Sequence, residues 1–342
     1  MIASSVFKLY ANCIPVKGAR RSVICDLQTG RAQLVPNDCF MILTEFAGRT
    51  IGEIKAYYDN EQDQTIDEYF DLLVKEDYGF LCDEADRFPA LSLDWERPEP
   101  ITNAIVDIDR TSKHDFGAIF SELSELGCQA VQIRAYDDLS LAELKRILEA
   151  TNHLCFRHLD LIVKYQPELT EAALTELCLG HQVTSRVLVH SSPSQSKADT
   201  DKLSFAIRFF EEPVTPLSCG EVAPGYFSVN VEHFTEALHF NSCLNRKISI
   251  SVDGQIKACP AMAHSCGDIG EVSLRAAARD PVLVQLNRIT KDQIDVCRDC
   301  EFRYICTDCR AFVSEPGNLY SKPAKCSYDP YTATWGSSNG SH

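Results

Sequence analysis

The sequence predicts an α/β protein built from three parts, and three observations support this. Residues 1–85 combine short strands with short helices, residues 101–210 alternate apolar strands with amphipathic helices, and the last hundred residues contain a ladder of seven cysteines. Domains usually contain about 100–200 residues, so a chain of 342 residues has room for two or three. We therefore expect a small N-terminal unit, a (β/α) domain and a cysteine-rich C-terminal domain.

Residues 1–85 are expected to form a small winged helix. Short apolar runs predict strands at Phe7–Ala11, Val23–Asp26 and Arg31–Val35. Three helices should follow, the first opened by Pro36-Asn37 and the others by the capping boxes Thr50-x-x-Glu53 and Thr65-x-x-Glu68. Three strands with three short helices are typical of a winged helix. The DNA-binding members of that class need a basic surface, which this sequence lacks.

Residues 86–100 read as a proline-rich linker, and residues 101–240 as a domain of repeated strand–helix units. Strands are predicted at Ile101–Ile108, Ala130–Arg134, His158–Tyr165 and Val183–His190. Helices are predicted at Phe116–Leu126, after the capping box Ser140-x-x-Glu143, and at Thr170–Leu179. Repeats of this length imply a parallel sheet covered by helices, as a partial (β/α) barrel or an open fold.

Composition narrows the possible partners and the compartment. A net charge of −16 and a pI near 5.0 disfavour a nucleic-acid partner, because phosphate binding needs a concentrated basic face. The first residues lack the basic start of a signal peptide, and no apolar run approaches the ~20 residues of a membrane span. We therefore expect a cytoplasmic protein without a membrane partner, in which sixteen cysteines indicate metal rather than disulfides.

The cysteine ladder occupies residues 241–342, the expected C-terminal domain. Cys243 and Cys259 flank a predicted hairpin with Asp253-Gly254 at its turn, and the other five members are Cys297, Cys300, Cys306, Cys309 and Cys326. In a C-x2-C pair the intervening turn returns the second sulfur beside the first, so both thiolates can bind one soft metal centre. The distant members require the domain to fold back on itself, which couples metal binding to folding.

The ladder resembles the SPASM domain, a C-terminal extension of radical S-adenosylmethionine enzymes that mature peptides and proteins. The resemblance implies two auxiliary 4Fe–4S clusters. By position, Cys243, Cys259 and Cys309 would serve the first cluster, and the second would be held by Cys297, Cys300, Cys306 and Cys326. One departure is visible, since the family's interval before the sixth cysteine is three residues and here only Thr307 and Asp308 intervene.

Two four-iron clusters need eight ligands, and the ladder supplies seven. Cys219 is the favoured eighth ligand, with Cys266, His233 or His239 as alternatives, or one iron stays open. The alternative to iron and sulfur is one or two structural zinc sites, because four cysteines at these spacings also suit tetrahedral zinc.

The radical-generating motif C-x3-C-x2-C is missing. It belongs after the first barrel strand, where residues 109–115 contain no cysteine. The middle domain therefore resembles a degenerate radical-enzyme barrel, and S-adenosylmethionine is not expected as a cofactor. Asp107, Asp109 and His114 occupy the rim where a barrel would hold its chemistry, but the sequence assigns them no catalytic role.

The whole chain resembles the SPASM-domain peptide maturases of grasp-with-spasm systems, which act on ribosomally made peptides. The match rests on the order of the three parts and on the segment from Asn241 through Asp253-Gly254-Gln255-Ile256-Lys257. Residues 1–85 resemble the PqqD-like element that binds a leader peptide by strand addition. The implied partners are a precursor peptide and an ATP-grasp ligase. The alternatives are an enzyme that modifies the peptide through an open auxiliary cluster, and a zinc-stabilised regulator or scaffold.

Overall fold

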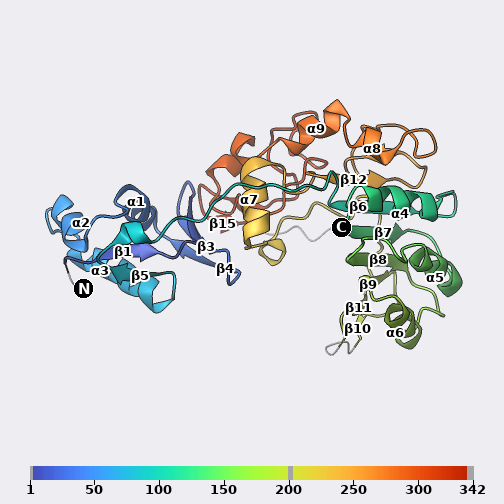
Figure 1. Ribbon diagram of the computed structural model, residues 1–342, viewed down its shortest axis with the longest axis horizontal. Helices are drawn as coiled ribbons and strands as arrows, with labels where there is room; N and C mark the ends of the chain where they lie inside the picture. The colour runs from blue at the N-terminus through green and yellow to red at the C-terminus, as the bar shows by residue number, and fades with distance from the viewer. Residues whose placement is uncertain (1–2, 199–202, 337–342) are drawn as a thin grey trace. The chain divides into compact units, whose positions relative to one another are not determined.

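The computed structural model in Figure 1 describes residues 3–198 and 203–336. The chain divides into two compact units. The first contains Met1–Glu96, Gly220–Ser242 and Ile289–His342, and the second contains Arg97–Cys219 and Cys243–Arg288. The cysteine-rich segment expected at residues 241–342 thus contributes to both units, and the four expected domain ranges remain predictions.

The first unit begins with two small sheets and three helices. Strand β1 (Val6–Leu9) pairs antiparallel with β5 (Gly79–Cys82). A second antiparallel sheet has the order β2–β3–β4, with bounds Cys13–Lys17, Ser22–Asp26 and Arg31–Val35. The helices are α1 (Asn37–Glu45), α2 (Ile51–Tyr57) and α3 (Asp63–Lys75). The expected strands and helices are present, β2 and β5 are additional, and the winged-helix class remains a prediction.

The two predicted capping boxes of this region have different outcomes. The Thr50 box is confirmed, with both reciprocal hydrogen bonds to Glu53 in place at the start of α2. The Thr65 box is wrong, because α3 already begins at Asp63 and Thr65 lies inside it. Asp59 and Asn60 take positive φ values of 54° and 59°, and this tight turn lets the next helix begin early.

The rest of the first unit comes from the C-terminal half of the chain. It contains helix α7 (Val231–His239), strands β14 (Tyr328–Asp329) and β15 (Thr334–Trp335), and the 3-10 turns η2 (Pro224–Tyr226), η3 (Lys291–Gln293) and η4 (Cys297–Asp299). A further 3-10 turn, η1 (Ala85–Arg87), follows β5. Buried Phe234, Phe302, Ile305 and Tyr328 join Val23 and Cys25 of β3 in one apolar core.

The second unit confirms the α/β prediction with an eight-stranded, mostly parallel sheet. Its order is β10–β11–β9–β8–β7–β6–β12–β13, in which β10 and β13 are antiparallel edges. The bounds in chain order are Asn103–Ile108, Ala130–Ala135, His158–Lys164, Thr184–His190, Ser196–Lys197, Ala206–Phe209, Lys247–Ile250 and Ile256–Lys257. This order of parallel neighbours is consistent with a partial (β/α) barrel.

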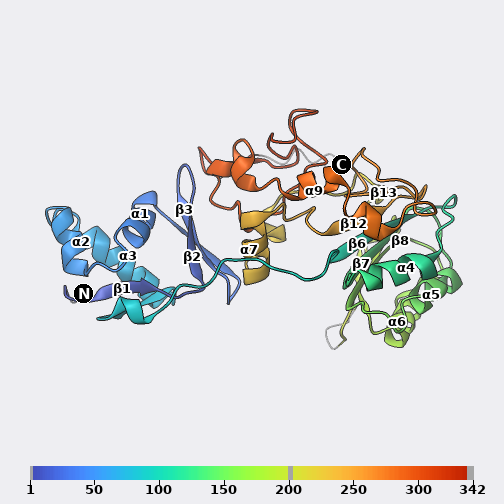
Figure 2. The ribbon, with the colours of Figure 1, turned by 45° about the horizontal axis from the view of Figure 1, so that its top comes forward.

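Helices cover one face of this sheet. Figure 2 shows α4 (Phe116–Glu125), α5 (Leu141–Glu149) and α6 (Glu171–Gly180) along the same side, where their buried leucines and isoleucines meet the strands. The capping box at Ser140 and the N-cap at Thr170 are confirmed. Two short helices, α8 (Leu274–Ala277) and α9 (Pro281–Asn287), follow the predicted hairpin of β12 and β13. Among the residues that the structure describes, no helix combines the length and apolar character needed to cross a membrane.

The other face of the sheet carries a buried ion pair between two neighbouring strands. Asp107 of β6 and Arg134 of β7 lie in register, and Nε and Nη2 of Arg134 donate to the two carboxylate oxygens at 2.7 Å each. Tyr136 donates to the same carboxylate at 2.8 Å. Both charged side chains are almost fully buried, so each depends on the other for compensation.

Replacing Arg134 with alanine should lower the free energy of unfolding by about 3–5 kcal/mol, because Asp107 would stay buried without its partner. The matched control is Arg110→Ala, which removes an exposed arginine paired with Asp138 and should cost less than about 1 kcal/mol. Urea unfolding of both variants measures the difference, and equal losses would contradict the assignment.

Candidate functional site

The four cysteines expected to hold the second cluster lie together in the first unit. Cys297, Cys300, Cys306 and Cys326 line one cavity, whose empty volume including its open mouth is about 350 Å³. Aromatic side chains form much of the remaining wall: Phe227, Phe302, Tyr328 and Trp335. The structure thus gathers four soft ligands in a largely apolar pocket.

Local turns bring these cysteines to the cavity. Cys297 opens η4, and the Cys300 N–H donates to the Cys297 carbonyl at 3.0 Å, which is the return turn that C-x2-C spacing predicts. The Cys306 N–H donates to the Phe302 carbonyl at 3.1 Å in a second turn. Val296, just before η4, has a φ of 67°, an unfavourable conformation for a β-branched residue that sets the direction in which the chain enters the turn.

A buried lysine lies against this group of sulfurs. Lys291 is 2% exposed, and its ammonium donates to the Cys306 Sγ at 2.7 Å and to the carbonyls of Cys306 and Thr307 at 3.1 and 2.7 Å. Burial opposes a charge there, but the Cys306, Asp308 and Cys297 groups nevertheless raise the pKa of Lys291. The cavity therefore contains a buried cation beside its sulfurs, which would offset part of the negative charge of a metal–thiolate centre.

The spacing of the sulfurs bears on which metal fits. A single tetrahedral zinc with Zn–S bonds of about 2.3 Å brings its sulfurs to within ~4 Å of one another. In the described part of the chain, one group of three ligating side chains has its donor atoms within 4.8 Å of each other, and it contains none of these four cysteines. An iron–sulfur cluster with one thiolate per iron and a structural zinc both remain predictions for these four cysteines.

Three further cysteines gather in the second unit. Cys243 and Cys259 stand at the same end of the β12–β13 hairpin, and Cys219 hydrogen-bonds the side chain of Cys259. This bond, helped by the charges of Lys247 and Arg134, lowers the pKa of Cys259 to about 6 against the effect of burial. A lowered pKa favours the thiolate form of Cys259, which is the form that binds metal.

Lys247 lies against the cysteines of the second unit, as Lys291 lies against those of the first. Its ammonium lies 3.9 Å from the Cys243 Sγ. Burial opposes the charge, but Cys243, Cys259 and Cys219 together raise the pKa of Lys247. The sequence had favoured Cys219 as a ligand beside Cys243 and Cys259, and the structure brings it to them.

Cys309 belongs to the first unit and is buried beside Gly220. A Cβ on Gly220 would lie 2.8 Å from the Cys309 sulfur, and Gly220 has a φ of +83°. The short interval before Cys309 contains Asp308, whose carboxylate pairs with Arg310 at 2.8 Å and accepts from Asn241 at 2.9 Å, all three being buried. Asp308 therefore has a structural role, which could not be inferred from the spacing of the cysteines.

The alternative ligands lie elsewhere. His233 is in the first unit, where it bonds the backbone of Cys306, and His239 bonds the Leu93 carbonyl at 3.1 Å. Cys266 lies beside His264 and Asp280. Outside the ladder, single cysteines set among apolar residues are predicted from the sequence to be small buried side chains. Five of these seven are buried, whereas Cys82 is half-buried and Cys155 is exposed; the buried ones are Cys13, Cys25, Cys39, Cys128 and Cys178.

The three residues predicted at the rim of the barrel, Asp107, Asp109 and His114, make hydrogen bonds that stabilise the surrounding structure. Asp107 is held by Arg134 and Tyr136, and Asp109 caps its own loop through Thr111 and Ser112. His114 Nε2 bonds the Asp107 carbonyl at 2.8 Å. Sequence reasoning missed Arg134, although an arginine in an otherwise apolar predicted strand is a signal of a buried partner.

Comparisons with known proteins give a distant structural likeness. No protein-family model matches the chain, and no curated protein matches it. Crystal structures of SuiB from Streptococcus suis, alone and bound to S-adenosylmethionine, each align with a TM-score of 0.36 and 12% identity over 94% of this chain and 98% of SuiB. The structure of SuiB bound to its precursor peptide SuiA aligns over the same shares with a TM-score of 0.33 and 8% identity.

Gly220→Ala should destabilise the protein more than Gly317→Ala. Both glycines have positive φ values, +83° and +86°, and each alanine would cost about 1 kcal/mol or more in backbone strain. Only at Gly220 would the new methyl group also overlap the Cys309 sulfur and Phe312, because nothing lies within 4 Å at Gly317. We expect a further ~1–3 kcal/mol from this overlap, measured by urea unfolding. Equal effects would show that Cys309 is free to move.

Proposed function

We propose that this protein is a component of peptide maturation that binds a ribosomally made precursor peptide and carries two 4Fe–4S clusters but no radical S-adenosylmethionine centre. The observation that carries the proposal is the cavity lined by Cys297, Cys300, Cys306 and Cys326 beside buried Lys291. Four thiolates are the standard ligand set of such a cluster. Bound there, it would supply one-electron transfer and a metal core that orders the surrounding loops.

The second set supports the other cluster. Cys219, Cys243 and Cys259 lie around Lys247, and the resemblance of the sequence assigns Cys309 to the same cluster. A thiol from Cys219 beside Cys259 favours full ligation over an open iron, and thus a structural or electron-transfer role over Lewis-acid chemistry. The sequence motif for a third, radical-generating cluster is missing from residues 109–115.

A groove in the N-terminal region supports peptide binding. One edge of β1 pairs with β5, and beyond a single bridge from Val6 to Thr50 no strand among the described residues pairs with the other edge. Residues 7–11, from β1 and the turn after it, line the groove, and so do Ile42 and Leu43 of α1 and Phe46 directly after that helix. An extended peptide that pairs with this edge would gain backbone hydrogen bonds and place alternate side chains against α1.

The charges of the groove indicate the kind of peptide. Of its described lining residues, the charged ones are Lys8 and Arg49, both basic, in a chain whose net charge is −16. We infer that the bound segment combines apolar side chains with acidic ones. The resemblance to grasp-with-spasm systems adds an ATP-grasp ligase as the partner that modifies the peptide.

Anaerobic reconstitution of the full chain should load about eight irons, the content of two four-iron clusters. Cys306→Ala should reduce this to about four, whereas Cys178→Ala, which removes a buried thiol packed in the apolar core of the second unit, should leave it unchanged. Iron analysis and visible absorbance measure both. Zinc as the sole metal would overturn the cluster proposal, and formation of 5′-deoxyadenosine from S-adenosylmethionine would overturn the lost radical centre.

Lys8→Glu should weaken binding of an extended peptide that carries apolar and acidic side chains by about tenfold, or ~1.4 kcal/mol, because it reverses a charge in the groove. The control Lys75→Glu makes the same charge change on the exposed end of α3, outside the groove, and should alter binding less than about twofold. Fluorescence titration of the labelled peptide with each full-length variant provides the comparison. Equal losses would place the peptide elsewhere.

A further inference from the structure

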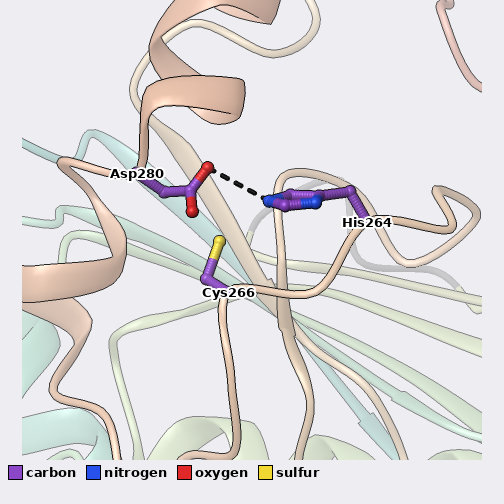
Figure 3. Close-up of side chains that lie close together, drawn as sticks. All are labelled: His264, Cys266 and Asp280. Carbon is purple, nitrogen blue, oxygen red and sulfur yellow. Dashed lines mark hydrogen bonds and ion pairs between the residues drawn. The ribbon is translucent and has the colours of Figure 1, made fainter.

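Three side chains outside both cysteine groups converge at one point of the second unit. His264 and Cys266 come from the loop that follows β13, and Asp280 comes from the N-terminus of α9. Figure 3 shows the imidazole and the thiol directed towards the carboxylate of Asp280. One nitrogen, one sulfur and one oxygen donor all lie within 4.8 Å of one another.

The donor types and distances suit a divalent transition metal. Imidazole nitrogen, thiolate sulfur and carboxylate oxygen are the three ligand classes of zinc, which binds them at about 2.0–2.3 Å. Ligands around one tetrahedral ion are then separated by ~3–4 Å. His264 Nε2 lies 3.1 Å from Asp280 Oδ1, so the imidazole is already beside the carboxylate that would share the ion.

Helix capping does not use up the carboxylate. Oδ1 of Asp280 accepts from the backbone N–H groups of Val282 and Leu283 at 2.8 and 3.2 Å and from His264. Oδ2, for which the described residues provide no hydrogen-bond donor, is the oxygen on the side of Cys266 in Figure 3. One carboxylate oxygen therefore caps the helix while the other remains available to a metal.

The loop that carries the other two ligands is anchored to the sheet. The Cys266 N–H donates to the Ile256 carbonyl at 2.8 Å, and the Ile256 N–H donates to the Gly267 carbonyl at 2.9 Å. Ser265 bonds Gln255 at 2.8 Å. The ligand loop is thus preorganised, and side-chain exposures of 36% for His264 and 22% for Asp280 leave one direction open to water.

We propose that His264, Cys266 and Asp280 bind one zinc-class divalent ion with a fourth position open to solvent. The ion would join the loop after β13 to α9. This site does not depend on the iron–sulfur clusters. It also gives Cys266 a role different from that of an eighth cluster ligand.

The test is zinc binding by the reconstituted full-length protein, titrated in competition with a chromophoric chelator, with iron content measured in parallel. The wild type should bind one zinc per chain. His264→Ala and Cys266→Ala should weaken binding at least ~100-fold, since losing even an outer-shell partner costs about 10–100-fold. Asp280→Asn should weaken it similarly while preserving the helix cap, because asparagine caps as well as aspartate.

Matched controls are His158→Ala and Cys178→Ala, which remove a histidine bonded to Ser185 and a core cysteine and should leave zinc binding unchanged. Cobalt substitution should give a sulfur-to-metal charge-transfer band that Cys266→Ala abolishes. Three results would overturn the proposal: no zinc in the wild type, zinc retained in any of the three ligand variants, or zinc bound only where iron is lost. If the iron content is the same in all variants, a loss of zinc binding is due to the zinc site and not to loss of the iron–sulfur clusters.

Discussion

The first unit depends on β3, a strand buried on both faces. All five of its residues, Ser22–Asp26, are buried. Ile24 faces the core formed with α1, α2 and α3, whereas Val23 and Cys25 face the core that contains Phe302, Ile305 and Tyr328. Because successive side chains of a strand point to opposite faces, this one strand closes two apolar cores at once. The N-terminal helices and the cysteine-rich segment are therefore parts of one folding unit.

The loop between β2 and β3 strengthens this connection. The Ala19 N–H donates to the Asp299 carbonyl at 2.7 Å, and Arg303 donates to the Lys17 carbonyl at 2.6 Å. Gly18 allows the close approach, since a Cβ there would lie 2.9 Å from the Glu301 nitrogen. Asp299, Glu301 and Arg303 lie in the same stretch of chain as three cysteines of the cavity, Cys297, Cys300 and Cys306. Residues of β2 also line the proposed peptide groove, so this hairpin contacts both the groove and the segment that carries the cysteines of the cavity.

Each cysteine group is paired with a lysine, Lys291 in the first unit and Lys247 in the second. Buried charge is costly unless it is compensated, and thiolates that bind an iron–sulfur core keep a net negative charge. A fixed ammonium beside each group reduces that cost in a protein that is acidic overall. The two lysines, which come from different elements, therefore support the proposal that both cysteine groups bind an iron–sulfur cluster.

Much of the local structure followed from the sequence. The β12–β13 hairpin around Asp253-Gly254, the return turn from Cys297 to Cys300 and the capped helices at Thr50 and Ser140 depend on turn chemistry and periodicity within a few residues. The Thr65 prediction failed because Asp59 and Asn60, two residue types that tolerate positive φ, form a turn that moves the helix start to Asp63. Packing between separate elements decided that residues 220–242 join the N-terminal segment, that Cys219 meets Cys259, and that Asp280 meets the loop of His264 and Cys266. Local pattern determines an element, but its neighbours are chosen by the burial of apolar surface between segments far apart in the chain, and that choice is recorded only in the tertiary structure.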